Sequence, residues 1–318
     1  MQPWQDRPAD LTRWILGARP PKNRLDAQRA YGVFTESEPD AGGRVIDVLT
    51  VLLTNRECPF RCLMCDLWRN TLDHPTPAGA IPDQIRDAMR RFPDFGAIKL
   101  YNAGNFFDGQ AIPRADWPRM GELLRGVERV IVESHPKLIG RHTTAFRDLI
   151  AGRLEVAIGL ETAHEGVLER LNKQMTLDDF KRAVAWLRKQ DIDVRAFILL
   201  RPPFLSESEG VTWARRSIDL AFDAGAQCCV VIPTRGGNGA MERLAESGHF
   251  EPPSLDSLEV VLDYGVALNR GRVFADLWDL ERLHAGAPNL DARLERLRRI
   301  NLTQTVSPPV SILVEVPT

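Results

Sequence analysis

The chain has 318 residues, of which 44% are hydrophobic and 26% are charged, and its 41 Lys and Arg residues nearly balance its 43 Asp and Glu residues. This ordinary globular mixture is long enough for one large α/β domain with an appendage or for two modest domains. The net charge of −2 argues against a standing nucleic-acid-binding role, which usually shows a basic domain or stripe, but it does not exclude a transient one.

The sequence indicates neither a membrane span nor a secretion signal. No apolar run of about 18 residues or more occurs, and the polar start MQPWQDRPADLTRW lacks the apolar core of a signal peptide. The five cysteines do not suggest a disulfide framework, because three are crowded into eight residues and the other two, Cys228 and Cys229, are adjacent. Adjacent residues of a strand point to opposite faces, so they are a poor disulfide pair. We therefore expect a cytoplasmic protein in a reduced compartment.

Apolar segments of strand length alternate along the chain with amphipathic segments of helix length. The strand segments are rich in β-branched residues, which is typical of a parallel sheet covered by helices. Six successive βα units without an evident reversal of strand order favour a closed or partly closed barrel over an open doubly wound sheet. The expected strands are 45–53, 97–103, 129–134, 154–161, 193–200 and 226–233, and the expected helices are 81–92, 116–127, 141–152, 164–189 (a pair) and 207–225.

Three regions follow from this alternation. Residues 45–249 are expected to form the core barrel, residues 1–44 a short N-terminal extension, and residues 250–318 a short C-terminal extension that closes the barrel. Within the last region the expected elements are a helix at 254–269, a strand-like segment at 272–278 and a final apolar strand at 310–316.

Polar residues stand at the ends of the predicted strands. The carboxyl ends of the strands carry the chemistry in βα barrels. An unpaired carboxylate among Val and Ile is costly, so Glu133 and Glu161 each imply a partner, and an ordinary salt bridge to a neighbouring loop is the structural alternative. The strand-end residues are Asn55, Asn102, Asn105, Glu133, Glu161, Arg201 and Thr234.

The segment TNRECPFRCLMCDLW (54–68) follows the first predicted strand and holds Cys58, Cys62 and Cys65. A zinc site normally has four ligands, a cytosolic redox pair needs only one CxxC spacing, and the stretch is too polar for buried structural cysteines. Thiolates suit the iron of an iron–sulfur cube, and three thiolates leave one of its four irons open to a small molecule. We therefore favour a cluster with one open iron over the other interpretations.

CxxxCxxC directly after the first strand of repeated βα units resembles the radical S-adenosylmethionine (SAM) superfamily. The resemblance implies a partial (β/α)6 TIM-like barrel, a [4Fe–4S] cluster on the three cysteines, and SAM chelated at the open iron. It also implies that an electron from a reductant such as flavodoxin or ferredoxin cleaves SAM to methionine and a 5′-deoxyadenosyl radical, which abstracts hydrogen from the substrate.

The same resemblance implies a SAM-binding set around the cluster. Met64 stands where the family commonly has an aromatic residue beside the adenine, and a thioether can make a soft apolar contact of the same kind. Gly104 allows close backbone approach, although Asn and Gly are also common in ordinary turns. The expected cofactor-binding residues are Met64, Asn102, Ala103 and Gly104 (the SAM amino group), Glu133 (the ribose), Glu161, Arg195 (the SAM carboxylate) and Ile232 (the adenine).

Candidate substrate contacts rest on weaker signals. The segment PTRGGNGAMERL (233–244) has a glycine-rich turn that opens a helix, so free amides could cradle an anion, but a flexible turn explains it about as well. The rigid Pro202-Pro203 follows a strand-end arginine that could line the pocket. The expected substrate-binding residues are Asn105, Arg201, Arg235 and Asn238, and no catalytic acid or base is identified.

Further strings, among them YNAGNFFD, VIVESHPKLI, EVAIGLET, LNKQMT and LLRPPFLSESEG, resemble the branch that contains the Elongator catalytic subunit and the radical SAM component of archaeosine synthase. The predicted function is nevertheless a radical SAM enzyme for a small-molecule substrate, because the charge is near neutral and no RNA-binding appendage is visible. The alternatives are an enzyme that modifies a tRNA base (an archaeosine-like deazaguanine) and a non-enzymatic protein with a three-Cys zinc site.

Overall fold

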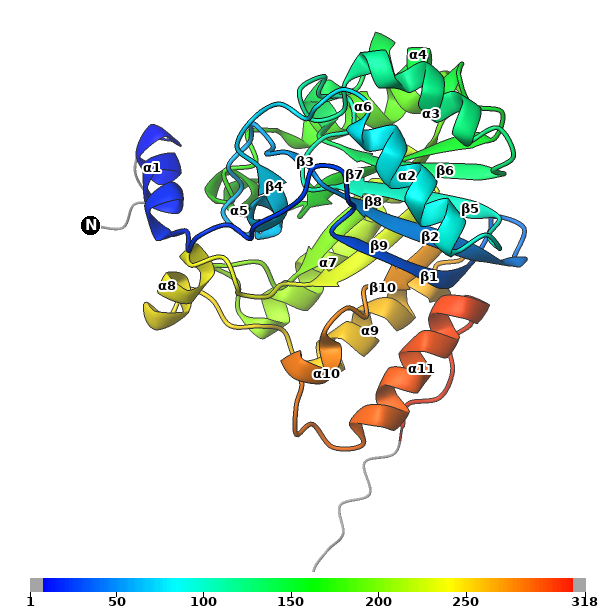
Figure 1. Cartoon of the computed structure of the whole chain (residues 1–318). Coiled ribbons are helices and arrows are strands. Elements are labelled where there is room, and N and C mark those ends of the chain that lie inside the picture. The colour runs from blue at the N-terminus through cyan, green and yellow to red at the C-terminus, as the bar shows by residue number, and fades with distance from the viewer. Residues whose placement is uncertain (1–7, 311–318) are drawn as a thin grey trace, which may run out of the picture.

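Eight strands form one curled sheet at the centre of the molecule (Figure 1). The computed structural model describes residues 8–310. The first two strands of the sheet pair antiparallel, and every later strand lies parallel to its neighbour. In sheet order they are β1 (Gly32–Pro39), β2 (Val45–Leu53), β5 (Ala97–Asn102), β6 (Arg129–Ser134), β7 (Arg153–Glu161), β8 (Asp193–Leu200), β9 (Cys228–Pro233) and β10 (Arg272–Ala275).

The six predicted strands are confirmed, and each predicted extension adds one strand to the same sheet. β1 was not predicted, because its sequence GVFTESEP is too polar for a buried strand, and β10 is the first part of the predicted segment 272–278. The curled, mostly parallel sheet is the partial TIM-like barrel that the sequence indicated. The predicted strand 310–316 lies, except for its first residue, outside the described residues.

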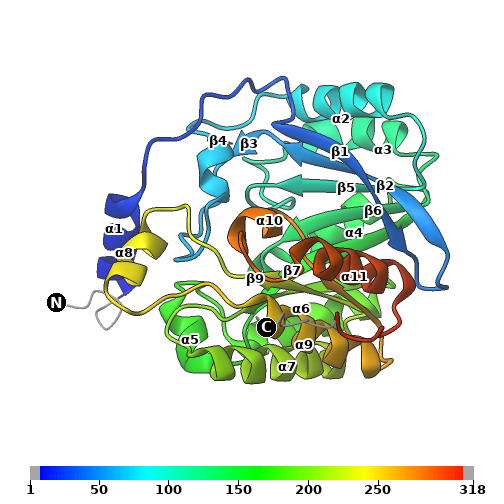
Figure 2. The same ribbon diagram turned by 90° about the horizontal axis from the view of Figure 1, so that it is seen from below.

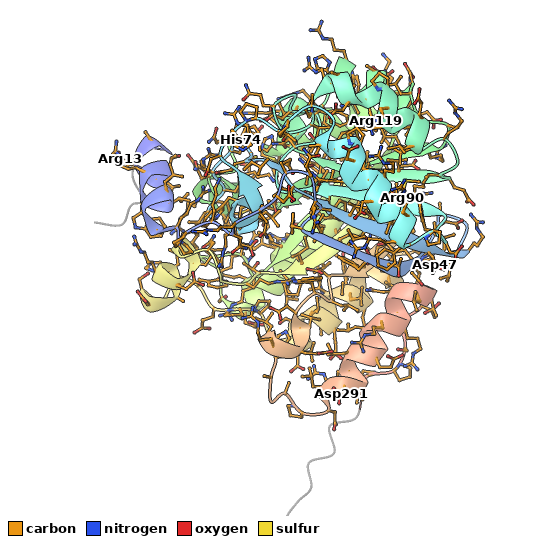
Figure 3. The ribbon with its side chains drawn as sticks, in the orientation of Figure 1. Arg13, Asp47, His74, Arg90, Arg119 and Asp291 are labelled. Atoms are coloured by element: carbon orange, nitrogen blue, oxygen red, sulfur yellow. The ribbon has the colours of Figure 1, made fainter. Side chains whose placement is uncertain are left out.

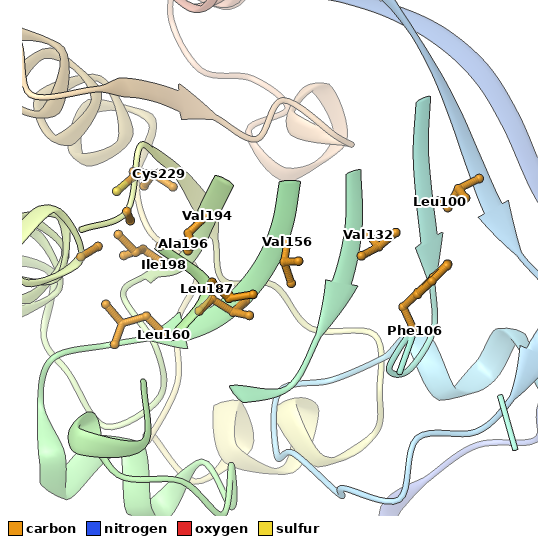
Figure 4. Close-up of a cluster of buried hydrophobic side chains, with 14 of the residues drawn as sticks. Leu100, Phe106, Val132, Val156, Leu160, Leu187, Val194, Ala196, Ile198 and Cys229 are labelled. Carbon is orange, nitrogen blue, oxygen red and sulfur yellow. The ribbon is translucent and has the colours of Figure 1, made fainter. Parts of the chain in front are cut away.

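Helices cover the outer face of the sheet, and their apolar faces form the main core with the outward side chains of the strands. Leu100, Val132 and Val156, from three neighbouring strands, lie in this layer (Figure 4). The helices are α1 (Pro8–Ala18), α2 (Ala80–Arg91), α3 (Trp117–Leu123), α4 (Arg141–Arg147), α5 (Glu165–Arg170), α6 (Leu177–Lys189), α7 (Glu207–Ala224), α8 (Ala240–Glu246), α9 (Leu255–Ala267), α10 (Leu280–Leu283) and α11 (Leu290–Thr303).

Local signals explain where several helices begin and end. At the start of α7 the Ser206 hydroxyl accepts a hydrogen bond from the Glu209 amide while the Glu209 carboxylate accepts one from the Ser206 amide. The same helix ends at Gly225, whose φ of 107° suits glycine. The predicted helix 141–152 ends earlier, at Arg147. Gly152 instead lets its backbone approach that of Val127 closely, because a Cβ at residue 152 would lie 2.1 Å from the carbonyl oxygen of Val127.

The two edge strands of the sheet, β1 and β10, are joined through the C-terminal region. α11 packs against both edge strands, and the Arg272 guanidinium on β10 donates a hydrogen bond to the carbonyl of Pro39 at the end of β1. The gap in the partial barrel is therefore covered by a helix rather than by a further strand. In the span 8–310 no helix is both long and apolar enough to cross a membrane, and the cytoplasmic location stays a prediction.

A second, smaller core lies at the carboxyl ends of the strands. It joins α1, α5 and α8 to the loop that carries the three cysteines, and Leu63 of that loop is fully buried in it. Both views show α1 and α8 side by side (Figures 1 and 2). The short strands β3 (Asn55–Arg56) and β4 (Thr71–Leu72) flank the cysteine loop. The loop is thus packed between the barrel and two helices, α1 and α8, that are far apart in the sequence.

Candidate cluster and cofactor site

Cys58, Cys62 and Cys65 lie on one loop that follows β3, and each thiol is partly exposed. Burial raises the pKa of Cys58 to about 11 and the pKa values of Cys62 and Cys65 to about 12, and the charges of the neighbouring cysteines add to each increase. Three thiols that influence one another in this way are neutral without a metal. Binding of iron would therefore release protons from them.

The thiols do not form a site for a single metal ion. Among the described residues, no three His, Cys, Asp or Glu side chains are grouped so that they could hold one ion. A four-iron cube makes a different demand, because each thiolate binds a different iron and the sulfurs need not converge on one point. Three cysteines on one short loop therefore fit such a cube.

Two asparagines fix the backbone of the cysteine loop from opposite sides. The side-chain amide of Asn238 donates to the carbonyls of Leu63 (2.7 Å) and Cys65 (3.1 Å), and its oxygen accepts from the Met241 amide. The side-chain amide of Asn172 donates to the carbonyl of Arg61 (2.7 Å). Asn238 was predicted to bind substrate, but the structure places it at 2% exposure as a support of the loop.

Unpartnered polar atoms gather beside the first cysteine. Both side-chain polar atoms of Asn102 are buried without a hydrogen bond, and so is the side-chain oxygen of Asn55. Gly104 lies among them, because a Cβ there would stand 3.5 Å from both side-chain amide nitrogens and 3.5 Å from the Cys58 backbone nitrogen. Buried polar groups normally find partners, so this cradle fits a polar ligand at the cysteines. It contains the predicted Asn102, buried Ala103 and Gly104.

Glu133 closes the next side of this cradle. One of its oxygens accepts a hydrogen bond from the backbone amide of Asn102 at 2.7 Å. Burial raises the pKa of Glu133 to about 8, even though the Asn102 amide and the charge of Lys173 lower it. At neutral pH the group is therefore mostly a carboxylic acid, and its protonated oxygen can donate a hydrogen bond to a ligand hydroxyl.

Glu161 has a partner that the sequence did not suggest. The Lys173 ammonium, also buried, lies 2.6 Å from the Glu161 carboxylate. Burial alone would lower the pKa of Lys173, but Glu161 together with Cys62 and Cys58 raises it above its ordinary value. A permanent cation thus stands close to the thiols. The only sequence signal was the LNKQMT string, in which the lysine had no assigned role.

Two predicted apolar contacts also lie at this end of the barrel. Met64 is partly exposed and packs against the second core between α1, α5 and α8. Ile232 on β9 is partly exposed inside the barrel, where it packs against the cluster of Cys228, Val230 and Phe274. The geometry is compatible with contacts to a ligand that spans the mouth of the barrel.

Arg195 is not brought to the cysteines. Its guanidinium donates to Glu155 at 2.6 Å and to Glu38 at 2.7 Å, and it is 1% exposed near the amino ends of the strands. The prediction for Arg195 came from an assumed register. Both partners are themselves buried and lie far from it in the chain, so local sequence could not reveal this pairing.

Arg201 and Arg235 are engaged by neighbouring loops. Arg201 pairs with Glu251 at 2.6 Å and with Glu207 at 2.8 Å, which fastens the start of the C-terminal region. Arg235 pairs with Asp276 and donates to the Trp278 carbonyl at 2.6 Å. Burial raises the pKa of Asp66 on the cysteine loop, and the charge of Arg235 partly opposes this increase.

The glycine-rich turn does cradle an anion, but that anion belongs to the chain. The amides of Gly237 and Gly239 donate to the carboxylate of Glu242 in the first turn of α8. The predicted anion site is therefore occupied by the side chain of Glu242. Asn105, also predicted to contact substrate, is instead bonded to a cysteine, with its side-chain nitrogen 3.0 Å from the Cys58 sulfur.

Comparisons with known proteins agree with this geometry. The profile of the Radical SAM superfamily matches residues 52–209. Archaeosine synthase subunit beta of Methanosarcina acetivorans is 28% identical over 227 residues, which are 67% of this chain and 65% of that protein. The protein of the same name from Thermococcus kodakarensis is 28% identical over 250 residues, which are 72% of this chain and 75% of that protein. The match thus spans slightly less than two thirds of the first relative.

Among solved structures, the archaeal Elp3 of Methanocaldococcus infernus with an N-terminal deletion is 13% identical, with a TM-score of 0.48, over 62% of this chain and 51% of that chain. The profile match begins inside β2 and ends in α7, so it contains the cysteine loop and every strand from β5 to β8. With its CxxxCxxC loop at the mouth of a partial barrel, this chain belongs to the radical SAM superfamily of enzymes.

Proposed function

We propose that this enzyme binds one [4Fe–4S] cluster through Cys58, Cys62 and Cys65 and cleaves SAM reductively to start a reaction on its substrate. One observation carries the proposal: three mutually influencing thiols on one loop lie beside a cradle of unpartnered polar atoms from Asn55 on β3 and Asn102 on β5. The cradle offers donors and acceptors where a polar ligand of an open iron would lie. Flavodoxin or ferredoxin remains the expected class of reductant.

When bound, the cluster and SAM would supply one-electron cleavage of the sulfonium and abstraction of a hydrogen atom from substrate. The residues of the chain bind and orient. Asn102, Ala103 and Gly104 would hold the amino acid end of SAM by side-chain and backbone groups, and the protonated Glu133 would donate to a ribose hydroxyl. Met64 and Ile232 would supply apolar contacts to the adenine.

The packing around the loop limits the access of water to the reacting groups. α1 and α8 cover the cysteine loop through the second core, and the buried Lys173–Glu161 pair lies on the barrel side. The lysine offsets part of the negative charge that three thiolates would bring. Exclusion of water matters because a carbon radical must meet only the intended C–H bond.

A small molecule is the substrate that the charge distribution favours. Charged side chains of both signs project from several elements rather than from one stripe, as Arg13, Asp47, Arg90, Arg119 and Asp291 illustrate (Figure 3). Many surface arginines are also paired with a carboxylate on the same helix or a neighbouring one. A strong phosphate-binding surface usually needs unpaired cations on one face.

A tRNA base is the second candidate substrate. Two relatives are named archaeosine synthase subunit beta. The structure adds Trp278, whose side chain is 62% exposed just beyond the carboxyl end of β10, with its ring centroid 5.8 Å from that of Phe34. Exposed aromatic rings are the common platform for an unstacked base.

Anaerobic reconstitution tests the proposed function. The full chain is loaded with iron and sulfide, reduced with dithionite and given SAM, and 5′-deoxyadenosine is measured together with bound iron. We expect about four irons per chain and formation of 5′-deoxyadenosine, both lost in the Cys58→Ala variant. A Cys228→Ala variant is the matched control and should retain its iron. A wild-type protein that holds the cluster but never cleaves SAM would count against the proposal.

Binding of total tRNA to the loaded enzyme separates the two substrate candidates. Binding with a Kd of about a micromolar that weakens steeply as salt increases would support the tRNA candidate. Trp278→Ala should then weaken binding on the order of tenfold, since stacking on an aromatic side chain contributes about 1–3 kcal/mol per base. The absence of salt-sensitive binding would leave the small-molecule candidate.

A further inference from the structure

A side-chain amide reaches one of the three cysteine sulfurs directly. Asn105 follows β5 and is 1% exposed, and its Nδ2 donates a hydrogen bond to the Cys58 Sγ over 3.0 Å. Backbone amides of the cysteine loop also approach the sulfurs, that of Phe60 at Cys58 and those of Leu67 and Trp68 at Cys65. Cys58 differs in having a side-chain donor as well, which lies 47 residues away in the segment that follows β5.

The orientation of the Asn105 amide is set by its other atom. Its Oδ1 accepts a hydrogen bond from the backbone amide of His135 at 2.6 Å, so the nitrogen must point towards the sulfur. The His135 backbone follows β6, which pairs with β5 in the sheet. Two neighbouring strands therefore hold the donor in place, and the N–H···S contact does not depend on a mobile side chain.

The His135 side chain connects the segment that follows β6 to the cysteine loop. Its ring stacks on Phe60 of the loop with centroids 3.8 Å apart and an interplanar angle of 15°. Its Nε2 lies 2.9 Å from the Lys173 carbonyl, and its Nδ1 accepts from the Lys137 amide, so the proton resides on Nε2. The ring is thus a neutral packing element, and Asn105 is the group that addresses the sulfur.

We propose that Asn105 tunes the cluster by its N–H···S bond to Cys58 and makes the cluster easier to reduce by one electron. This inference rests on the proposed function, because it requires a cluster on Cys58. Reduction adds one negative charge to the cluster, supplied by the external reductant, and part of that charge is carried by the sulfur ligands. A fixed N–H dipole aimed at a ligand sulfur stabilises the reduced state more than the oxidised state, and hydrogen bonds to sulfur are a known determinant of cluster potential.

The test is a potentiometric titration of the reconstituted full chain, followed by the electron paramagnetic resonance signal of the reduced cluster in the absence of SAM. Asn105→Ala removes the donor, and Asn105→Asp keeps the shape but replaces the donor by a negative charge. We expect a more negative midpoint potential in Asn105→Ala and a further shift in the same direction in Asn105→Asp, at unchanged iron content.

Asn172→Ala is the matched control, because Asn172 supports the same loop through the Arg61 carbonyl and not through a sulfur. It should weaken iron binding without moving the potential. Equal potentials in the wild type and in both Asn105 variants would overturn the inference, and so would a failure of both variants to bind iron, since Asn105 would then serve assembly rather than tuning. A wild type without a reducible cluster would instead refute the proposed function itself.

Discussion

Glu133 is a carboxylic acid rather than a carboxylate at neutral pH, because burial raises its pKa to about 8 from an ordinary value of 4.5. Between these two values the folded chain holds a proton that the unfolded chain has lost. The contribution of Glu133 to the free energy of unfolding is therefore present below pH 4.5 and declines as the pH rises towards 8.

Glu133→Gln removes this pH dependence at nearly constant shape. Relative to the wild type, the variant should be unchanged near pH 4.5 and more stable at pH 9, on the order of 1–2 kcal/mol because solvent reaches part of the side chain. Chemical denaturation of the metal-free chain across this range provides the measurement. The control is Glu246→Gln on the exposed surface of α8. A constant difference between variant and wild type at all pH values would contradict the assignment.

The contact of Asn105 with Cys58 and the role of Lys173 could not be predicted from the sequence. The spacing of three cysteines is a local pattern, so it could be recognised within eight residues. The Asn105–Cys58 bond spans 47 residues, and the Lys173 charge acts on thiols from a different βα unit. Such contacts depend on how neighbouring strands align, and the identity of the residue alone does not reveal them.

At the scale of elements, the glycine-rich turn before α8 is a structural joint. Gly239 has a φ of 85°, and a Cβ on it would lie 2.0 Å from the carbonyl oxygen of Ala18 at the end of α1. The close approach lets α1 and α8 cover the cysteine loop together. Gly237 in the same turn has a φ of 116°, but a Cβ on it would meet nothing within 4 Å.

This contrast gives a paired prediction. Gly237→Ala should lower the free energy of unfolding by about 1–2 kcal/mol through backbone strain alone. Gly239→Ala should cost about 3 kcal/mol or more, because the strain is joined by a clash with a backbone atom. It should also expose the cysteine loop to faster alkylation of its thiols. Equal losses in the two variants, measured by chemical denaturation, would show that contact with α1 is not the reason for Gly239.

At the scale of the whole molecule, one buried carboxylate connects four strands at the floor of the barrel. Glu155 on β7 is fully buried and accepts hydrogen bonds from Arg195 (2.6 Å), Arg129 (2.6 Å) and Arg272 (3.0 Å). Burial alone would raise the pKa of Glu155, but these three arginines lower it to about 2. Glu38 on β1 adds a further partner for Arg195, so the antiparallel edge strand takes part in the same network.

Glu155→Gln should therefore destabilise the whole barrel by about 3–5 kcal/mol, because it leaves several arginines buried without full compensation. The lowered pKa means that the wild type keeps this stabilisation above about pH 4.5 and loses it as the pH falls towards 2, whereas the variant has no such acid-dependent loss. The matched control is Glu36→Gln, a more exposed member of the same network whose side chain is 38% exposed. Comparable losses in the two variants would contradict the central role of Glu155.

Strands could be predicted from the sequence where apolar residues follow one another without interruption. The prediction failed where the buried residues of a strand form ion pairs. Six apolar, β-branched runs marked six strands correctly, since a strand covered by helices must be apolar. β1 was missed because it carries two glutamates that pair across the sheet, the buried Glu38 with Arg195 and the partly exposed Glu36 with Lys99. Charged residues in a sequence suggest an exposed segment, and only the structure shows that their ion-pair partners lie inside the barrel.

The sequence by itself determined the family, because the spacing of three cysteines within one short loop is a local property. It also determined the class of fold, since the period of apolar residues is local as well. Only the tertiary structure decided what surrounds that loop. Asn105 reaches a cysteine sulfur, Asn238 supports the loop from the turn before α8, and Arg195 lies in the barrel floor. Strand register and helix packing bring together these groups, which are tens to hundreds of residues apart.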